Sequence, residues 1–181
     1  MDSVERPGRG FTMYAVNYLP MRDMKKSITG CCPPFDPAEW DGQTFTFDRK
    51  LFLKFPTRSL FHVPVGMNYK MRAIMARVEE VGATSPDHLM LSEEVSSWKS
   101  EQYLAVTKEV PGEEMVLLSG TYVTKVFEGP FKDIHTWYDE LIAYVKGLGK
   151  TPIKTYFNYT MCPNCAKAYG HNYVVGFEQV A

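Results

Sequence analysis

Two stretches of helical periodicity, each closed by a glycine, are the feature that most constrains the fold of this chain. In each stretch the apolar residues recur every three or four positions, which is typical of a helix with one buried face. The first spans residues 66–81 and ends before Gly82, and the second spans residues 131–148 and ends before Gly149. A helix with one apolar face must pack that face on a sheet or on another helix.

The segments around these two helices alternate apolar and polar residues, which predicts β-strands. A strand region precedes each predicted helix and two strands follow it. The segment "QYLAVTKEV" of the first half also matches "NYVVGFEQV" of the second. We therefore predict an α+β domain of two βαββ repeats related by a pseudo-two-fold axis, with an antiparallel sheet and two helices. The expected strand regions are residues 44–64, 88–94, 101–110, 115–129, 153–159 and 172–180.

The first part of the chain has no sustained periodicity. It contains "RPGRG", "CCPPFDP" and "WDGQ", in which proline and glycine favour turns over regular elements. We expect residues 1–43 to form an irregular N-terminal arm that packs, through Phe35 and Trp40, on a single domain of residues 44–181. Binding of a partner protein by this arm is an alternative role.

Composition and charge exclude several classes of function. The net charge is −1, which provides no electrostatic attraction for nucleic acid or an anionic membrane. The longest apolar runs have the length of strands, so we expect no membrane span. The first residues, "MDSVERPGRG", are charged and precede no apolar signal segment, which favours a cytoplasmic protein. We therefore expect neither nucleic acid nor a membrane as a partner, and the oligomeric state is not predicted.

One long segment carries a family resemblance. "LSGTYVTKVFEGPFKDIHTWYDELIAYVKGLGKTPIKTYFNY" joins a glycine-containing strand, an aromatic-x-Gly-Pro turn, an amphipathic helix, a glycine and a strand that ends in tyrosine. This order resembles the gyrase-inhibitor-like family, best over residues 115–180 and more broadly over 58–180. That family shares its fold with the effector-binding domains of multidrug-responsive transcription activators and with SOUL haem-binding proteins. The cysteine segments "GCCP" and "CPNCAKAYGHNYVV" resemble a bacterial branch labelled as hydrolases.

The resemblance implies a fold and a function together. The fold would be two βαββ repeats with a cleft along the pseudo-two-fold axis. Family members bind small aromatic or cationic molecules through an acidic residue surrounded by tyrosines and tryptophans, and some bacterial members hydrolyse strained cyclopropane compounds that alkylate DNA. Binding of an aromatic or amphipathic molecule, with or without its hydrolysis, is therefore the leading hypothesis. The N-terminal arm and the cysteines have no counterpart in the family pattern.

The candidate binding residues are rings at matching places in the two repeats. Glu101 lies between Trp98 and Tyr103, and a carboxylate desolvated by rings has a raised pKa that suits general acid or base catalysis. We therefore predict Glu101 as a catalytic residue of a hydrolase. The alternative is that the rings fill a half-buried sheet and that Glu101 lies on a solvated face. The predicted ligand-binding residues are Trp98, Tyr103, Tyr156, Tyr159, Tyr169 and Tyr173.

The four cysteines offer a second function, a zinc- or thiol-dependent protein. Cys162 and Cys165 have the C-x-x-C spacing that zinc sites and thiol redox pairs share, and Cys31 and Cys32 form an adjacent pair. Adjacent cysteines seldom both bind one tetrahedral ion, because their side chains diverge. The candidate zinc ligands are these four cysteines, and the expected set is both cysteines of C-x-x-C, one of the adjacent pair and, as a further ligand, His171. His62, by contrast, is expected to be a structural histidine.

A reactive thiol is the other interpretation of the same motif. Pro163 suits the first position of a short helix and Gly170 suits its end, which would place Cys162 at the N-cap. The helix dipole and Lys167 would then lower the pKa of the Cys162 thiol and make it a catalytic nucleophile or a redox group. The third interpretation is that the cysteines only pack, as small apolar side chains do.

Overall fold

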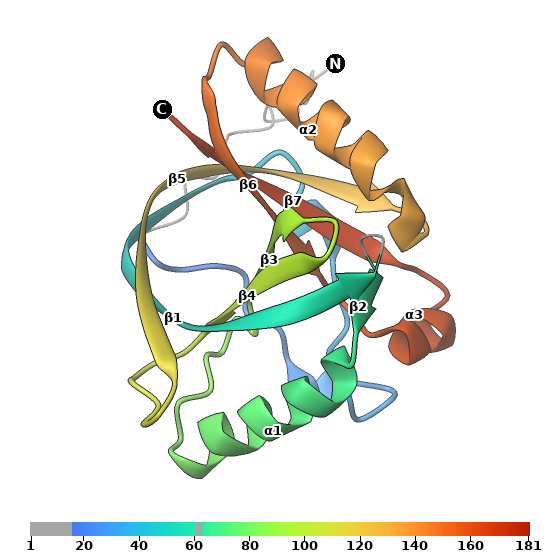
Figure 1. Cartoon of the computed structure of the whole chain (residues 1–181). Helices are drawn as coiled ribbons and strands as arrows, with labels where there is room; N and C mark the ends of the chain where they lie inside the picture. Colours follow the sequence, from blue (N-terminus) through green and yellow to red (C-terminus); the bar gives the residue numbers. More distant parts are fainter. Residues whose placement is uncertain (1–15, 61–62) are drawn as a thin grey trace, which may run out of the picture.

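The computed structural model describes residues 16–60 and 63–181. Residues 1–15 of the expected arm, and His62, lie outside these ranges. Within the described ranges, six antiparallel strands close into a barrel, and helices lie on its outside (Figure 1). Around the barrel the strands are β1 (Thr44–Leu60), β4 (Lys99–Ala105), β3 (Met90–Ser96), β6 (Pro152–Tyr159), β7 (Tyr173–Val180) and β5 (Glu114–Glu128), which pairs again with β1. The short β2 (Val63–Val65) pairs with the end of β1.

The predicted α+β class is confirmed, and the sheet closes on itself. α1 (Met67–Glu80) and α2 (Ile134–Gly147) occupy the predicted helical segments and lie on different outer sides of the barrel (Figure 1). The short helix predicted after Cys162 is α3 (Pro163–Tyr169). Three 3-10 turns complete the described elements: η1 (Met24–Lys26), η2 (Pro37–Glu39) and η3 (Phe131–Asp133). Within the described chain, no helix is both long and apolar enough to cross a lipid bilayer.

The region predicted as several strands over residues 44–64 is mostly one strand, the 17-residue β1. Its pairing with β5 shifts register between Phe47 and Lys50, where Arg49 has a φ of 51°. The irregularity changes which alternate residues face inward, so that Phe47 before it and Phe52 after it both belong to the core inside the barrel. This change of phase explains why the sequence pattern looked interrupted.

Aromatic side chains fill the barrel. Its interior cluster includes Phe47, Phe52, Tyr122 and Phe177, all no more than 2% exposed. Trp40 from the arm joins this cluster, 1% exposed, with its ring centroid 5.7 Å from that of Phe45. Two further clusters lie outside the barrel, one beneath α1 and one beneath α2. The core therefore has three parts, and the arm contributes to the central one.

Candidate functional site

Two carboxylates lie opposite each other on the inner face of the barrel. Glu93 in β3 and Glu101 in β4 are cross-strand partners. Side chains two residues apart on a strand share a face, and Leu91 and Tyr103, the neighbours of these two residues, belong to the interior cluster. We call the set Lys54, Glu93, Glu101, Tyr103, Lys154 and Tyr156 the acidic–tyrosine cluster.

Each carboxylate of the cluster is held by lysines. Glu101 pairs with Lys54 at 2.5 Å and with Lys99 at 2.7 Å. Glu93 pairs with Lys154 at 2.9 Å and accepts a 2.7 Å hydrogen bond from the hydroxyl of Tyr103. Like charges directly opposite each other on a sheet are unfavourable. The lysines therefore provide positive charge that offsets the repulsion between the two carboxylates.

The same lysines also lie over tyrosine rings. Lys54 Nζ is 5.9 Å from the ring centroid of Tyr103, and Lys154 Nζ is 5.2 Å from that of Tyr156. The two rings meet edge to face, with centroids 5.6 Å apart. A cation within about 6 Å of a ring centroid is attracted by the π-electrons. The cluster is thus built to hold positive charge between carboxylates and aromatic faces.

The expectation that the pKa of Glu101 is raised is wrong. Hydrogen bonds from Lys54 and Lys99 lower the pKa of Glu101 below its usual range, and they outweigh burial, which acts the other way. Burial, followed by the hydrogen bond to Glu93, raises the pKa of Tyr103 far above that of a free tyrosine. The carboxylate is therefore ionised and the phenol protonated at neutral pH.

The structure brings together only part of the predicted aromatic set. Tyr103 and Tyr156 share the barrel interior with Glu101 nearby, whereas Trp98 is 56% exposed in the turn between β3 and β4. Tyr159 packs outside the barrel, next to the cluster beneath α2. Tyr173 stacks on His171, and the Tyr169 hydroxyl donates to the carbonyl of Cys32 at 3.1 Å.

Sequence reasoning missed three members of the cluster, Lys54, Glu93 and Lys154. Each lies on a different strand from Glu101, so their proximity depends on the strand register. One signal was present in the sequence. Each of these three charged residues lies two positions along its strand from a residue of the barrel core. Residues two apart on a strand share a face, so each charged side chain points to the inside of the barrel.

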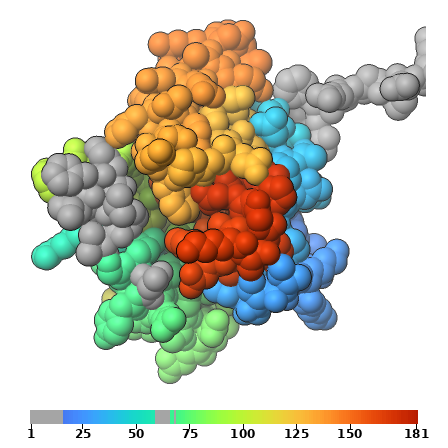
Figure 2. Space-filling model, turned by 90° about the vertical axis from the view of Figure 1, so that its right-hand side faces the viewer, coloured from blue at the N-terminus to red at the C-terminus, as the bar shows by residue number. Residues whose placement is uncertain are grey.

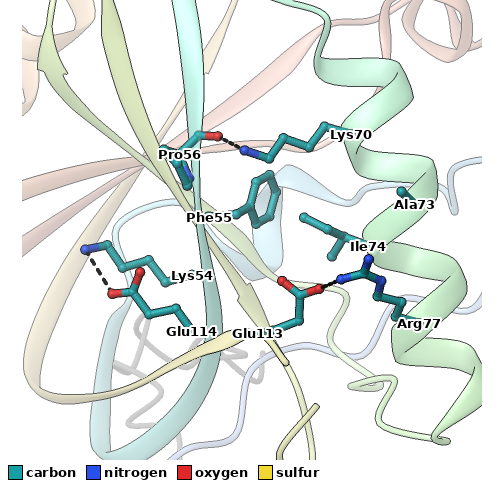
Figure 3. A pocket seen from close by; sticks show the side chains of 9 residues that line it. All are labelled: Lys54, Phe55, Pro56, Lys70, Ala73, Ile74, Arg77, Glu113 and Glu114. Carbon is teal, nitrogen blue, oxygen red and sulfur yellow. Dashed lines mark hydrogen bonds and ion pairs between the residues drawn. The ribbon is translucent and has the colours of Figure 1, made fainter. Parts of the chain in front are cut away.

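A hollow of about 340 Å³ lies between β1 and α1, and Lys54 is the one member of the acidic–tyrosine cluster that lines it (Figure 3). Its polar groups are engaged with one another. Arg77 pairs with Glu113, Lys54 contacts Glu114 at 3.5 Å, and Lys70 donates to the Pro56 carbonyl. A second hollow, of about 540 Å³, shares Pro56 and Lys70 with the first. Trp98, one of the predicted ligand-binding residues, lines it. The lining of the first is Lys54, Phe55, Pro56, Lys70, Ala73, Ile74, Arg77, Glu113 and Glu114.

All four cysteines converge on one point at the junction of the arm and α3. Their Sγ atoms lie within 4.8 Å of one another, and none of these four residues, all within the described chain, forms a disulfide. Cys162 is the N-cap of α3, as predicted, and its sulfur accepts from the Cys165 N–H at 3.4 Å. Figure 2 shows the C-terminal segment, in red, lying against the arm, in blue.

Two details of the cysteine prediction differ from the structure. Both Cys31 and Cys32 point into the cluster, because the chain turns irregularly after Gly30, which has a φ of 68°. His171 lies elsewhere and is bonded through Nδ1 to Glu128 at 2.9 Å. His171 is therefore not a neighbour of the thiols.

The thiols of Cys31, Cys32 and Cys165 differ in acidity. Burial raises the pKa of both Cys31 and Cys32 above that of a free thiol. Burial acts in the same direction on Cys165, but hydrogen bonds from Thr29 and from the other three cysteines prevail and lower its pKa to about 7. Of these three thiols, that of Cys165 is therefore the most acidic.

Comparisons with known proteins give a family match and similarity to solved structures. A family model described as bacterial hydrolase matches residues 22–180. No curated protein matches the chain. Among solved structures, the chain is similar to SAV2435, which was solved bound to tetraphenylphosphonium. The identity is 10%, the match covers 78% of this chain and 94% of that one, and the TM-score is 0.47.

Proposed function

The chain belongs to the bacterial hydrolase family, and we propose that it binds a small aromatic cation at the acidic–tyrosine cluster. One observation carries the proposal: Lys54 and Lys154 each pair with a carboxylate while lying over a tyrosine ring. The cluster therefore already binds two ammonium groups, both supplied by the protein.

A ligand cation would take the place of a lysine. The side chains of Lys54 and Lys154 are 24% and 39% exposed, so either can swing into solvent without disturbing the core. Their stems are flexible and their ammonium groups are strongly hydrated in water. A planar aromatic cation is less hydrated and offers a face to the tyrosine rings, so it gains more from the same carboxylates and rings.

Binding without hydrolysis is the function that the cluster supports best. A general base works best when its pKa lies near the operating pH, and that of Glu101 lies well below it. A cysteine nucleophile needs a base or another activating group within reach. The partners of the Cys162 sulfur within the described chain are Cys31 and the Cys165 amide. Glu101 therefore lacks the pKa of an efficient general base, and Cys162 contacts no general base among these partners.

The proposal extends to the origin of the site. When β1, β3 and β4 are exchanged for β5, β6 and β7, respectively, the pairings β1–β4, β4–β3 and β1–β5 become β5–β7, β7–β6 and β5–β1. This supports two βαββ repeats, as in the gyrase-inhibitor-like family that the sequence resembles. In that scheme β3 and β6, which pair with each other, carry Glu93 and Lys154 across the pseudo-two-fold axis.

A matched pair of dyes tests the ligand class. Pyronin Y and fluorescein share a xanthene ring but carry a positive and a negative charge, respectively. We expect fluorescence anisotropy to show binding of pyronin Y and none of fluorescein. Glu93→Gln and Glu101→Gln should each lower the affinity for pyronin Y by roughly tenfold, because each removes one charged hydrogen-bonding partner.

The control variant is Glu113→Gln, which removes a carboxylate that pairs with Arg77 in the hollow beside α1. It should leave the affinity for pyronin Y unchanged. Equal binding of both dyes, or the same affinity in wild type and in both cluster variants, contradicts the proposal. If only Glu113→Gln lowered the affinity for pyronin Y, the dye would bind in the hollow beside α1, and this result would also contradict the proposal.

A further inference from the structure

We propose that Cys31, Cys32, Cys162 and Cys165 together bind one zinc ion, which fastens the N-terminal arm to α3. This site is separate from the acidic–tyrosine cluster, and its function is structural. The adjacent pair comes from the arm and the C-x-x-C pair from the start of α3, so a single ion would join segments 130 residues apart in sequence.

The sulfur geometry fits a tetrahedral ion. Zinc–thiolate bonds of about 2.3 Å place the four sulfurs of a tetrahedron about 3.8 Å apart. Here Cys31 Sγ lies 3.8 Å from Cys32 Sγ and 4.0 Å from Cys162 Sγ, and all four sulfurs lie within 4.8 Å of one another. A disulfide needs about 2.05 Å between sulfurs. The thiols are therefore spaced for a shared ion.

The backbone around the sulfurs is arranged to receive thiolates. The Cys162 N–H points to Cys32 Sγ at 3.4 Å, and the Cys165 N–H points to Cys162 Sγ at the same distance. The Thr29 hydroxyl lies 3.1 Å from Cys165 Sγ. Donors of this kind orient metal ligands and stabilise their charge. Three of the four sulfurs therefore have a hydrogen-bond donor in addition to their neighbouring thiols.

A buried cation adjoins the cluster. Arg22 is 8% exposed and donates to the Pro33 carbonyl at 2.8 Å and to the Thr160 carbonyl at 2.7 Å. These carbonyls stand beside the two cysteine pairs, one on each segment. Among the described residues Arg22 forms no ion pair with a carboxylate, and its Nε has no hydrogen-bond partner. Zinc with four thiolates carries a net charge of about −2, so Arg22, which also lies over the Phe35 ring at 5.6 Å, supplies compensating charge.

The ligand type selects the metal and its role. Four sulfur ligands are unsuited to magnesium or calcium, which prefer oxygen, and the divalent affinity order places zinc above iron(II). A site with four protein ligands has no open position for substrate or water, which is the pattern of structural zinc. The ion would hold the arm in place while Trp40, eight residues after Cys32, packs in the barrel core.

The experiment measures metal in the full chain purified under reducing conditions with zinc supplied. Elemental analysis should give one zinc per chain. The double variant Cys162→Ser/Cys165→Ser should give less than about a tenth of that, because two of four ligands are lost. Cys31→Ser changes the most exposed thiol and is expected to fold. It should retain zinc that a chelator removes at least about tenfold faster than from wild type.

Cobalt provides a readout independent of zinc content. Wild type reconstituted with Co²⁺ should show the intense visible bands of tetrahedral thiolate coordination, and the double variant should not. Matched Ser27→Ala, which changes a hydroxyl that bonds to the Cys32 carbonyl but is no ligand, should keep both zinc and the cobalt bands. The proposal would be overturned by any of four results: iron in place of zinc, a disulfide in the reduced preparation, no metal in wild type, or full zinc in the double variant.

Discussion

Replacing Trp40 with alanine is expected to lower the free energy of unfolding by about 3–5 kcal/mol, the range for a large ring removed from a core. Trp40 is 1% exposed and packs against three rings, those of Phe35, Phe45 and Phe177. Its loss leaves a cavity inside the barrel that the closed sheet cannot collapse to fill. Urea denaturation followed by circular dichroism would measure the change.

The control for Trp40 is Met21→Ala, a change in the same arm. Met21 is 76% exposed, so its truncation should alter stability by no more than about 0.5 kcal/mol. The prediction attributes the effect to burial inside the barrel and not to the arm in general. Similar small effects of the two substitutions would show that Trp40 does not contribute to the core.

Gly176→Val should be the most disruptive small change in the barrel wall. A Cβ at this position in β7 would lie 2.7 Å from Leu141 Cδ2 and 3.2 Å from Phe127 Cε2. The Leu141 side chain is fully buried, so it can make room only by disturbing the packing beneath α2. Overpacking of this kind costs about 1–3 kcal/mol or more. Thermal unfolding should show a lower midpoint, together with a shift in the fluorescence of Trp137.

Gly147→Ala is the matched control for that substitution. Gly147 ends α2, it is exposed, and a Cβ there meets no atom within 4 Å. The alanine should stabilise the fold by roughly 0.5–1 kcal/mol, because glycine loses more backbone entropy in a helix. If both glycine variants change stability in the same direction, close packing at Gly176 is not the cause.

Local features of the fold were predictable from sequence. Gly82 and Gly149 follow the two long helices with φ values of 64° and 73°, a conformation that glycine adopts without strain. Pro163 and Gly170 likewise bound α3, with Cys162 as its N-cap. In each case the signal and the structure lie within a few residues of each other, so no tertiary information is needed.

Closure of the barrel was not predictable in the same way. It depends on β5 pairing with β1 as well as with β7, a choice between distant strands that alternation leaves open. The irregularity at Asp48 and Arg49 further hides that Phe47 and Phe52 face the same side. Local pattern therefore predicted the strands, whereas their order around the barrel required the three-dimensional structure.

The candidate site, too, was predictable only where its residues are close together in the sequence. Glu101 and Tyr103 were found because they are near neighbours in sequence, but the pKa direction of Glu101 was wrong because Lys54 comes from another strand. Similarly, C-x-x-C was readable as a motif. The convergence of Cys31 and Cys32 with it depends on the arm returning to α3 through contacts such as the Tyr169 hydroxyl to the Cys32 carbonyl.

The most direct test of the proposed cation site is the affinity of Lys54→Met for pyronin Y, measured by calorimetric titration. Methionine keeps an unbranched apolar stem but removes the ammonium group that lies over Tyr103 and pairs with Glu101. Since Lys54 competes with the ligand for these groups, its loss should tighten binding about tenfold, which is about 1.4 kcal/mol. Weaker or unchanged binding would contradict a site in which a ligand cation replaces the lysine.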